Sequence, residues 1–283
     1  MRNIKYFFQF LIIIILLSIY KILGLRYSTI LSGKIFIIFG PLFRSNDVCH
    51  QNLITAFPDL SKNQRNKILK MMWFNYGKML AEYLYINELK KPQNLIVENQ
   101  EVLDMIKKNS EPVIFISGHF NNFELMAMHI EKSGIDLAAI YRPLNNKFLN
   151  PIMEYIRKKH ICKKQIKKGI SGTKEILQSF KNGSSIALMI DQRVSQGIKS
   201  NLFNKEAFTT TIPAQFVKKF NTKIVPIYIE RIMDNNFRLK IYEPLKFEKN
   251  DSLETITLNL NKILEKMIAK NPEQWIWTHN RWK

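Results

Sequence analysis

The feature that most limits what this chain can fold into is an apolar run near its N-terminus, residues 6–20, which read YFFQFLIIIILLSIY. Apolar residues continue to Leu25, so the run reaches about 20 residues, the length with which a helix crosses the hydrocarbon core of a bilayer. Lys21 lies close enough to the end of the run for its ammonium group to reach the headgroups. We therefore expect a single membrane anchor. A cleaved signal peptide is the alternative, although no small-x-small cleavage site occurs around residues 23–27.

A second apolar stretch, residues 35–43 (IFIIFGPLF), is interrupted by Gly40 and Pro41 and is too short to cross a bilayer. It is typical of an interfacial or re-entrant segment beside the anchor, and a buried turn of the globular body is the other interpretation. We predict an anchor and interfacial segment over residues 1–45 and one globular domain over residues 46–283. Positive residues flank both ends of the anchor, so charge alone does not predict its orientation.

The composition narrows the class of protein further. The 283 residues include 43 Lys and Arg against 23 Asp and Glu, which gives a formal net charge of +20, and 46% of the residues are hydrophobic. This apolar content excludes a disordered polycation, and two distant cysteines, Cys49 and Cys162, exclude a disulfide scaffold and indicate reduced thiols in the cytosol. The charge favours an acidic partner or surface, and a biased base composition, visible in the many Lys, Ile and Asn residues, explains the excess equally well.

The body of the chain shows two periods of hydrophobicity. Residues 61–86 carry apolar side chains at helical spacing behind Ser61, which predicts a long amphipathic helix with a serine cap. Short apolar runs then predict strands at residues 113–117, 137–141, 186–190, 224–229 and 237–242, before a closing helix over residues 252–269. Strands that alternate with helices predict an α/β fold with a largely parallel sheet, and no internal repeat or break in composition indicates a second domain.

Polar residues follow three of the expected strands. His119 comes after the first strand, Arg142 after the second and Asp191 after the third. Because functional groups in open α/β sheets gather at the carboxyl ends of the strands, these three residues are candidates for a site.

The segment SGHFNNFE, residues 117–124, is the strongest local pattern. His119 lies in a turn after a strand and Glu124 in the first turn of an expected helix, a spacing at which the carboxylate can accept a hydrogen bond from one ring nitrogen and raise the basicity of the other. His119 would then act as a general base on a hydroxyl, while amides at the helix N-terminus stabilise an oxyanion. The structural alternative, compatible with the first, is a capping box formed by Asn121 and Glu124.

Further motifs follow in order along the chain: YRPLNN at residues 141–146, Asp191-Gln192, FTTTIPA at residues 208–214 and PEQWIWTHNRWK at residues 272–283. Together with the N-terminal apolar segment and the His119/Glu124 motif, they resemble the lipid A biosynthesis acyltransferases, the late lauroyl and myristoyl transferases of lipopolysaccharide synthesis in Gram-negative bacteria. The resemblance covers almost the whole chain. It departs from the family at residues 121–123, where Asn-Asn-Phe replaces the Gly-Asn-Trp of many members.

The resemblance implies a glycerol-3-phosphate-acyltransferase-like αβ sandwich with an N-terminal transmembrane helix, located in the inner (cytoplasmic) membrane with its acyltransferase domain, residues 46–283, on the cytoplasmic face. It implies transfer of a fatty acyl chain from an acyl-carrier-protein thioester to a hydroxyl of a Kdo-lipid A type precursor, with His119 as general base oriented by Glu124. Such a transfer needs a base, an oxyanion site and positioned substrates, and no cofactor. The implied partners are acyl carrier protein, the lipid A precursor and membrane lipids, and no nucleic acid.

Three further residues are expected to bind substrate. Arg142 offers a planar fork of donors for a phosphate or carboxylate, Asp191 matches the acid of the family's Asp-Gln pair, and Asn122 lies inside the motif. A structural salt bridge is the alternative for Arg142, and a loop or N-cap carboxylate for Asp191. His50, His129 and His160 lack metal-ligand spacing with any carboxylate or cysteine pair, so we predict no metal site.

Two other segments each leave two interpretations open. The basic cluster at residues 157–168 suits an acidic carrier protein or anionic headgroups, or is a solvated helix face. The final segment, with Trp275, Trp277 and Trp282 among basic residues, suits a membrane interface or the packing of the domain.

Other functions compete with this prediction. An acyl-CoA-dependent glycolipid or glycerolipid acyltransferase, such as a phosphatidylinositol mannoside acyltransferase, would use the same His119 and Glu124. A membrane-tethered basic adaptor would bind through charge alone, with steep salt dependence. A serine hydrolase is disfavoured because the sequence contains no Gly-x-Ser-x-Gly elbow.

Overall fold

A sheet of seven strands forms the centre of the protein. The computed structural model describes residues 2–283, apart from the side chains of Phe43 and Ile170. The strand order is β1-β9-β8-β2-β5-β3-β4, and every neighbouring pair is parallel except β8 with β9. The strands are β1 (Leu95–Glu98), β2 (Ile114–Ser117), β3 (Leu137–Tyr141), β4 (Lys164–Lys167), β5 (Ser185–Met189), β8 (Ile224–Met233) and β9 (Asn236–Ile241). The predicted α/β fold with a largely parallel sheet is therefore confirmed, while its assignment to the glycerol-3-phosphate-acyltransferase-like class stays a prediction.

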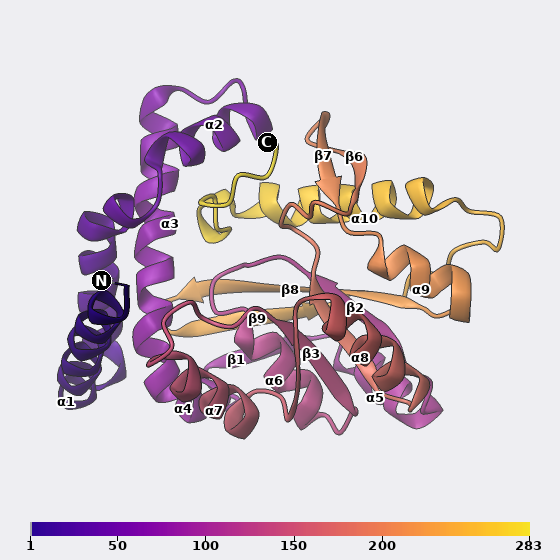
Figure 1. Cartoon of the computed structure of the whole chain (residues 1–283), viewed down its shortest axis with the longest axis horizontal. Helices are drawn as coiled ribbons and strands as arrows, with labels where there is room; N and C mark the ends of the chain where they lie inside the picture. The colour runs from indigo at the N-terminus through magenta and orange to yellow at the C-terminus, as the bar shows by residue number, and fades with distance from the viewer. Residues whose placement is uncertain (1) are drawn as a thin grey trace.

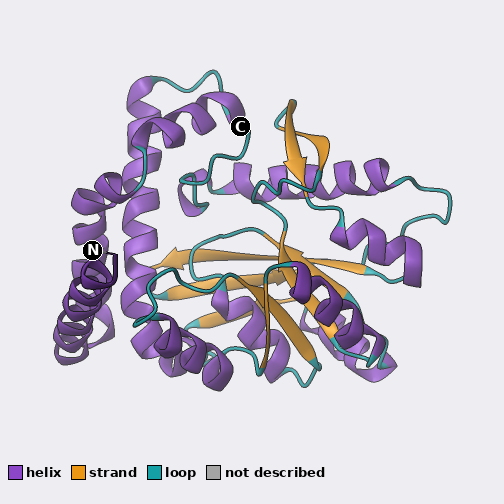
Figure 2. Cartoon of the chain, in the orientation of Figure 1, coloured by secondary structure: helices purple, strands orange, loops and turns teal. Residues whose placement is uncertain are grey.

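Helices cover both faces of the sheet (Figures 1 and 2). In this view α10 lies above the sheet and α6, α7 and α8 lie below it. A separate antiparallel pair, β6 (Ile198–Leu202) and β7 (Lys205–Thr209), projects beside α10. The helices of the body are α2 (Asn46–Ala56), α3 (Lys62–Glu82), η1 (Tyr83–Tyr85), α4 (Ile86–Leu89), α5 (Gln100–Asn109), α6 (Glu124–Lys132), α7 (Asn150–His160), α8 (Ile170–Lys181), α9 (Ile212–Phe220), α10 (Leu253–Lys270) and η2 (Pro272–Gln274).

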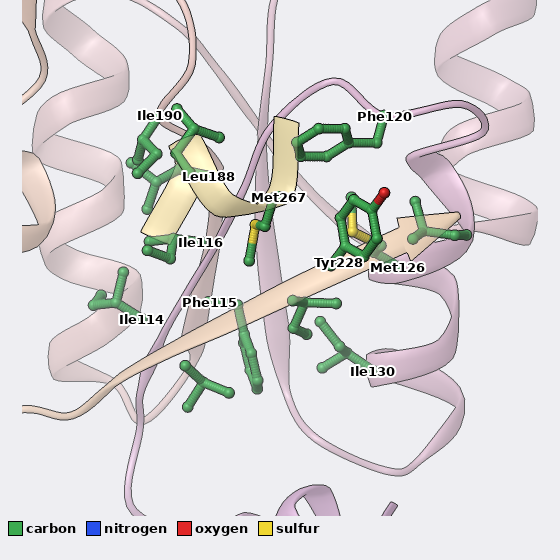
Figure 3. Packing of buried hydrophobic residues seen from close by; sticks show 14 of the residues in the cluster. Ile114, Phe115, Ile116, Phe120, Met126, Ile130, Leu188, Ile190, Tyr228 and Met267 are labelled. Carbon is green, nitrogen blue, oxygen red and sulfur yellow. The ribbon is translucent and has the colours of Figure 1, made fainter. Parts of the chain in front are cut away.

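The hydrophobic core lies on both sides of the central strands. All four residues of β2 are buried, as expected for a central parallel strand that has helices on both faces. Figure 3 shows side chains of β2 in one cluster with Met126 and Ile130 of α6 and with Met267 of α10. This packing fixes the end of β2, from which the SGHFNNFE segment continues.

The N-terminal apolar run forms helix α1 (Arg2–Phe43), which bends at Gly24, where φ is +72°. Within residues 2–283, α1 is the one helix that is long and apolar enough to cross a membrane, and only 6% of its most apolar window is buried. Residues 35–43 continue this helix, so no turn forms at Gly40 and Pro41, and the interfacial or re-entrant placement of this segment stays a prediction. Pro41, which has no N–H to donate, lies in the last turn, and the helix ends two residues later at Phe43.

The predicted amphipathic helix is confirmed as α3, with a capping box at its start. Ser61 Oγ accepts a hydrogen bond from the Gln64 amide (3.3 Å), and Gln64 Oε1 accepts one from the Ser61 amide (2.8 Å). The second part of α1 packs along α3, where Ser32 Oγ donates to the carbonyl of Gly77 at 2.5 Å. Helix α3 thus connects the apolar helix with the body of the fold.

Candidate active site

The candidate site lies where the parallel strands β2 and β5 end. These strands are neighbours, and Ser117 lies opposite Met189 in their register. His119 and Asp191 each come two residues later, so the two strand ends present an imidazole and a carboxylate side by side.

Asp191 binds His119 at two points. The imidazole Nδ1 of His119 lies 2.8 Å from Oδ1 and 3.1 Å from Oδ2 of Asp191, and the His119 backbone N–H donates to Oδ2 at 2.8 Å. Asp191 is 2% exposed, whereas the side chain of His119 is 22% exposed. The carboxylate is therefore enclosed by protein while the imidazole remains open on one side.

The charge state of Asp191 follows from these contacts. Burial raises the pKa of a carboxyl group, but the positive charge of His119 and the hydrogen bonds from His119 and Trp275 outweigh burial and lower the pKa of Asp191 to about 2. An ionised carboxylate can only accept hydrogen bonds, so whenever the imidazole of His119 is neutral, Nδ1 carries the hydrogen and Nε2 carries the lone pair. In this tautomer Nε2 can take a proton from a hydroxyl.

The expected hydrogen bond between His119 and Glu124 is wrong, because Glu124 binds other residues. Glu124 Oε1 accepts hydrogen bonds from Tyr83 Oη (2.7 Å) and from Nε and Nη2 of Arg157 (2.8 and 2.6 Å). Among the residues that the structure describes, no hydrogen bond joins Glu124 to His119. The first turn of α6 directs the carboxylate of Glu124 toward α7 and the end of α3. Asp191, and not Glu124, is the acid that is hydrogen-bonded to the imidazole of His119.

The group around Glu124 is a buried ion pair. The side chains of Arg157 and Glu124 are 12% and 8% exposed. Burial lowers the pKa of Arg157, but the negative charge and hydrogen bonding of Glu124 outweigh burial and raise it. Burial and the charge of Glu124 both raise the pKa of Tyr83, which therefore stays a neutral donor. Arg157 thus belongs to the site and not to a solvated basic face.

The side chain of Asn122 lies in the protein interior. It is 1% exposed, and its Nδ2 donates to Oε2 of Glu82 at 3.1 Å. Its contact with a substrate therefore stays a prediction, while its observed partner is the buried carboxylate of Glu82.

Arg142 lies at the same edge of the sheet, at the end of β3, two strands away from β2. At a strand spacing of about 4.8 Å this is roughly 10 Å along the edge. Arg142 is exposed, and it forms no ion pair with any carboxylate in the described part of the chain. Lys168 follows the neighbouring strand β4, and its backbone N–H donates to the carbonyl of Tyr141 at 2.8 Å. The edge beside the His119–Asp191 pair is therefore positively charged.

The C-terminal segment contributes to the site from the interior. Trp275 is 1% exposed and donates from Nε1 to Oδ2 of Asp191 at 2.8 Å, and Trp277 is fully buried against it with ring centroids 4.6 Å apart. Trp282 is partly buried and donates to the carbonyl of Leu202 at 3.1 Å. Of the two interpretations of this segment, packing of the domain is confirmed.

Local patterns could not reveal Trp275, Tyr83 or Arg157 as part of the site, because each comes from a distant segment. The PEQWIWTHNRWK motif was the one signal that pointed toward Trp275.

Apolar side chains, most of them fully buried, pack between Ser117 and helix α10: Ile116, Ile190, Leu260, Ile263, Leu264 and Met267. This packing belongs to the core and leaves no space for a ligand between these residues. In the described residues, no group of three or more His, Cys, Asp or Glu side chains lies close enough to hold a metal ion.

Comparison with known proteins gives one consistent result. The family described as "Bacterial lipid A biosynthesis acyltransferase" matches residues 1–283. The chain is 24% identical over 268 residues to the lipid A biosynthesis lauroyltransferase of Escherichia coli (strain K12), covering 89% of this chain and 82% of the relative. It is 21% identical over 232 residues to the myristoyltransferase of the same strain, covering 80% and 71%. It is 25% identical over 267 residues to a lipid A biosynthesis acyltransferase of Haemophilus influenzae, covering 87% and 82%. Since the family match spans the whole sequence, this chain belongs to the bacterial lipid A biosynthesis acyltransferases.

Proposed function

We propose that this acyltransferase moves a fatty acyl chain from an acyl-carrier-protein thioester to a hydroxyl of a Kdo-lipid A type precursor, with His119 as the general base and Asp191 as the residue that orients it. The family supports an acyltransferase that acts in lipid A synthesis. The observation that carries the mechanism is the double contact of Asp191 with His119, which leaves Nε2 free on the open side of the ring.

The reaction then needs only groups that this chain provides. Nε2 of His119 removes the proton of the acceptor hydroxyl as the oxygen attacks the thioester carbonyl. Backbone N–H groups at the start of α6 stabilise the tetrahedral oxyanion. The C–S bond breaks as the carbonyl re-forms, and the leaving thiolate takes the proton from the imidazolium. An ester and the free carrier thiol are the products.

Glu124 supports this chemistry in a different way from the one its spacing suggested. Its ion pair with Arg157 and its hydrogen bond from Tyr83 hold the first turn of α6 against α7 and α3. We assign Glu124 to the reaction as the acid that keeps the His119 turn and the start of α6 in place.

Arg142 is the proposed contact for an anionic group of a substrate. It is exposed beside the His119–Asp191 pair, and its guanidinium can donate two parallel hydrogen bonds to a phosphate or carboxylate. Lys168, which is exposed and follows β4 at the same edge of the sheet, adds positive charge that suits an acidic carrier protein as the donor.

Helix α1 supports a location at the inner membrane, with the acyltransferase domain on the cytoplasmic face. Its side chains stay exposed along both parts of the bent helix, with Ile12 at 63% and Leu42 at 77%. The start of the helix also lies beside the site edge, because Asn146 Nδ2 donates to the carbonyl of Tyr6 at 2.8 Å. An acceptor lipid in the bilayer would thus be close to Arg142 and His119.

The test is a transfer assay with His119→Ala in purified full-length protein. Labelled acyl-carrier-protein and acyl-CoA donors are supplied in separate reactions, and the label is traced into the lipid A precursor. We expect turnover with the carrier-protein donor to fall by about 10² to 10⁴, and His50→Ala in α2 to keep wild-type turnover. Near-normal turnover by folded His119→Ala protein would refute the mechanism, and a preference of the wild type for acyl-CoA would favour the alternative donor.

A further inference from the structure

The C-terminal end of helix α3 forms two hydrogen bonds with the catalytic turn, residues 119–124. Two consecutive residues there contact two residues of the motif: Glu82 accepts the hydrogen bond of Asn122, and Tyr83 donates to Glu124. The same helix carries the apolar helix α1 on its other side, where Ser32 meets Gly77.

Glu82 itself is in an unusual environment for a carboxylate. It is fully buried, and its Oε1 accepts a hydrogen bond from Nη1 of Arg231 at 2.6 Å. The side chain of Arg231 is 6% exposed and stacks on the ring of Phe237, with its guanidinium carbon 4.5 Å from the ring centroid. Nε and Nη2 of Arg231 have no hydrogen-bond partner among the described residues.

A buried ion pair of this kind is a weak source of stability. Removing two charged groups from water costs about as much as their attraction returns, and well-packed apolar residues in the same place are often as stable or more stable. Stability alone therefore does not explain why Glu82 and Arg231 form a buried ion pair. The hydrogen bond that Glu82 accepts from Asn122 gives the pair a second role, in holding the turn.

The turn that carries His119 depends on outside contacts for its shape. Asn121 lies in the left-handed region, with φ of +41°, a conformation that costs energy for a residue with a side chain. Its backbone N–H donates to the carbonyl of Gln274 at 3.0 Å, and its side chain also binds Gln274. Gln274 is in turn bound to the backbone of Arg231, with Oε1 2.9 Å from its N–H. Arg231 and its partners therefore border the turn on two sides.

We propose that Glu82 is a positioning residue for acyl transfer: its carboxylate, held by Arg231, fixes Asn122 and thereby sets the position of the imidazole of His119. This inference rests on the proposed role of His119. Because the proton acceptor must meet the acceptor hydroxyl within hydrogen-bond distance, a small displacement of the turn lowers the rate of the chemical step much more than the binding of either substrate.

The first test is Glu82→Gln in full-length protein. The amide keeps the volume of the side chain but loses the negative charge. Either Asn122 Nδ2 or Arg231 Nη1, the two donors to the carboxylate, then faces an NH₂ group that cannot accept a hydrogen bond. We expect kcat to fall by about tenfold to a hundredfold, with KM for the acyl donor within about twofold of wild type.

The second test reverses the hydrogen bond. In Glu82→Gln with Asn122→Asp, the glutamine amide donates to the new carboxylate, and the negative charge is kept close to Arg231. We expect kcat to recover at least half of the loss on a logarithmic scale. A merely structural role would restore the melting temperature in this double variant without restoring kcat.

Glu230→Gln is the matched control. Glu230 is also buried and also paired with basic residues, Arg238 and Lys270, but it has no hydrogen bond to the catalytic turn. It should lower the melting temperature and leave kcat per folded molecule unchanged. Where Glu82→Gln does not fold, Glu82→Asp replaces it, because the shorter side chain keeps the charge and withdraws from Asn122.

Three results overturn the inference: wild-type kcat in the folded Glu82 variant, an equal loss of kcat in Glu230→Gln, or a folded double variant as slow as the single one. His119→Ala, measured in the same assay, separates this failure from failure of the mechanism. If His119→Ala is inactive while the Glu82 variants are fully active, only the role of Glu82 is rejected.

Discussion

At the residue scale, the proposed mechanism depends on one carboxylate that accepts hydrogen bonds from three donors. Asp191 accepts hydrogen bonds from the backbone N–H of His119, from its Nδ1 and from Nε1 of Trp275. The first fixes the turn, the second fixes the tautomer, and the third fixes the carboxylate itself. These contacts leave the lone pair of the neutral imidazole on Nε2 of His119, at the end of β2. A base in this state can remove the proton of a hydroxyl group.

The acid of this pair could not be identified from local spacing. The six residues of the HFNNFE motif place Glu124 near His119 along the chain, but the side chain of an acid in the first turn of α6 points toward α7. Asp191 is 72 residues away and meets His119 only because β5 pairs with β2 in a register that aligns the two strand ends. Sequence reasoning found both residues as strand-end candidates, and the strand order decided which acid is the partner.

The shifted pKa of Asp191 leads to a prediction for Asp191→Asn. Since the pKa is lowered from 3.8 to about 2 in the folded state, the ionised carboxylate contributes stability of about 2 kcal/mol above pH 4. This contribution is lost as the pH falls from 4 to 2, because the folded protein must then take up the proton that the unfolded chain already holds. The free energy of unfolding of the variant should thus lie below that of wild type at pH 7 and approach it near pH 2, as measured by chemical denaturation in detergent.

The control for this prediction is Asp136→Asn, which removes a carboxylate from a half-exposed pair with Lys164. It should change the free energy of unfolding by less than about 1 kcal/mol at pH 7. A difference between Asp191→Asn and wild type that stays constant from pH 7 to pH 2 would show that Asp191 does not act through its charge.

At the scale of elements, hydrophobic pattern identified those strands and helices that bury a continuous apolar face. Strands were predicted at the positions of β2, β3, β5, β8 and β9, and the closing helix at that of α10. β4 was missed because three of its four residues (KQIK) are polar, and β6 and β7 were missed because they form a small separate sheet with few apolar residues. β1 is a short edge strand that pairs with β9 alone. The polar strands β4, β6 and β7 depend on pairing and not on burial, so their sequences carry little signal. The sequence of β1, LIVE, is mostly apolar, but the run is only four residues long.

The close packing of α1 on α3 leads to a prediction about Gly77. A Cβ atom at this position would lie 2.6 Å from Cβ of Phe36 and 2.6 Å from the carbonyl oxygen of Ser32, both of them in α1. Small residues allow such an approach between helices, and a larger side chain must force them apart. Gly77→Val should cost about 1–3 kcal/mol of stability and make α1 more sensitive to limited proteolysis in detergent.

Asn66→Val provides the comparison, since it places the same β-branched residue at an exposed position of the same helix. It should cost only the small helix propensity difference, a few tenths of a kcal/mol. If both variants unfold at the same temperature and are cleaved at the same rate, then the contact between α1 and α3 does not contribute to stability.

At the scale of the whole molecule, an apolar helix and a basic body lie on one chain, and the two features predict different modes of membrane binding. A formal net charge of +20 would bind anionic lipid in a way that salt weakens. The exposed apolar residues of α1 would bind in a way that salt leaves intact. The start of α1 also packs on the loop that follows β3, where Phe7 and Phe148 stack edge to face with centroids 5.6 Å apart. The apolar helix and the site edge are therefore held together, so the mode of binding determines where the site lies relative to the bilayer.

The last prediction separates these two modes. Ile12 and Ile15 are 63% and 61% exposed on α1, and a lysine near the centre of a bilayer costs about 2.5–3.5 kcal/mol. Ile12→Lys with Ile15→Lys should therefore weaken membrane binding by more than about a thousandfold, although it raises the positive charge. Sedimentation of cell membranes after a carbonate wash measures this: wild type should remain in the pellet, also at high salt, and the variant should move to the supernatant. Ile96→Lys with Met105→Lys, at positions of the body that are 51% and 44% exposed, should sediment like wild type. If the α1 variant stays in the pellet but leaves it at high salt, charge and not the apolar helix holds this protein on the membrane.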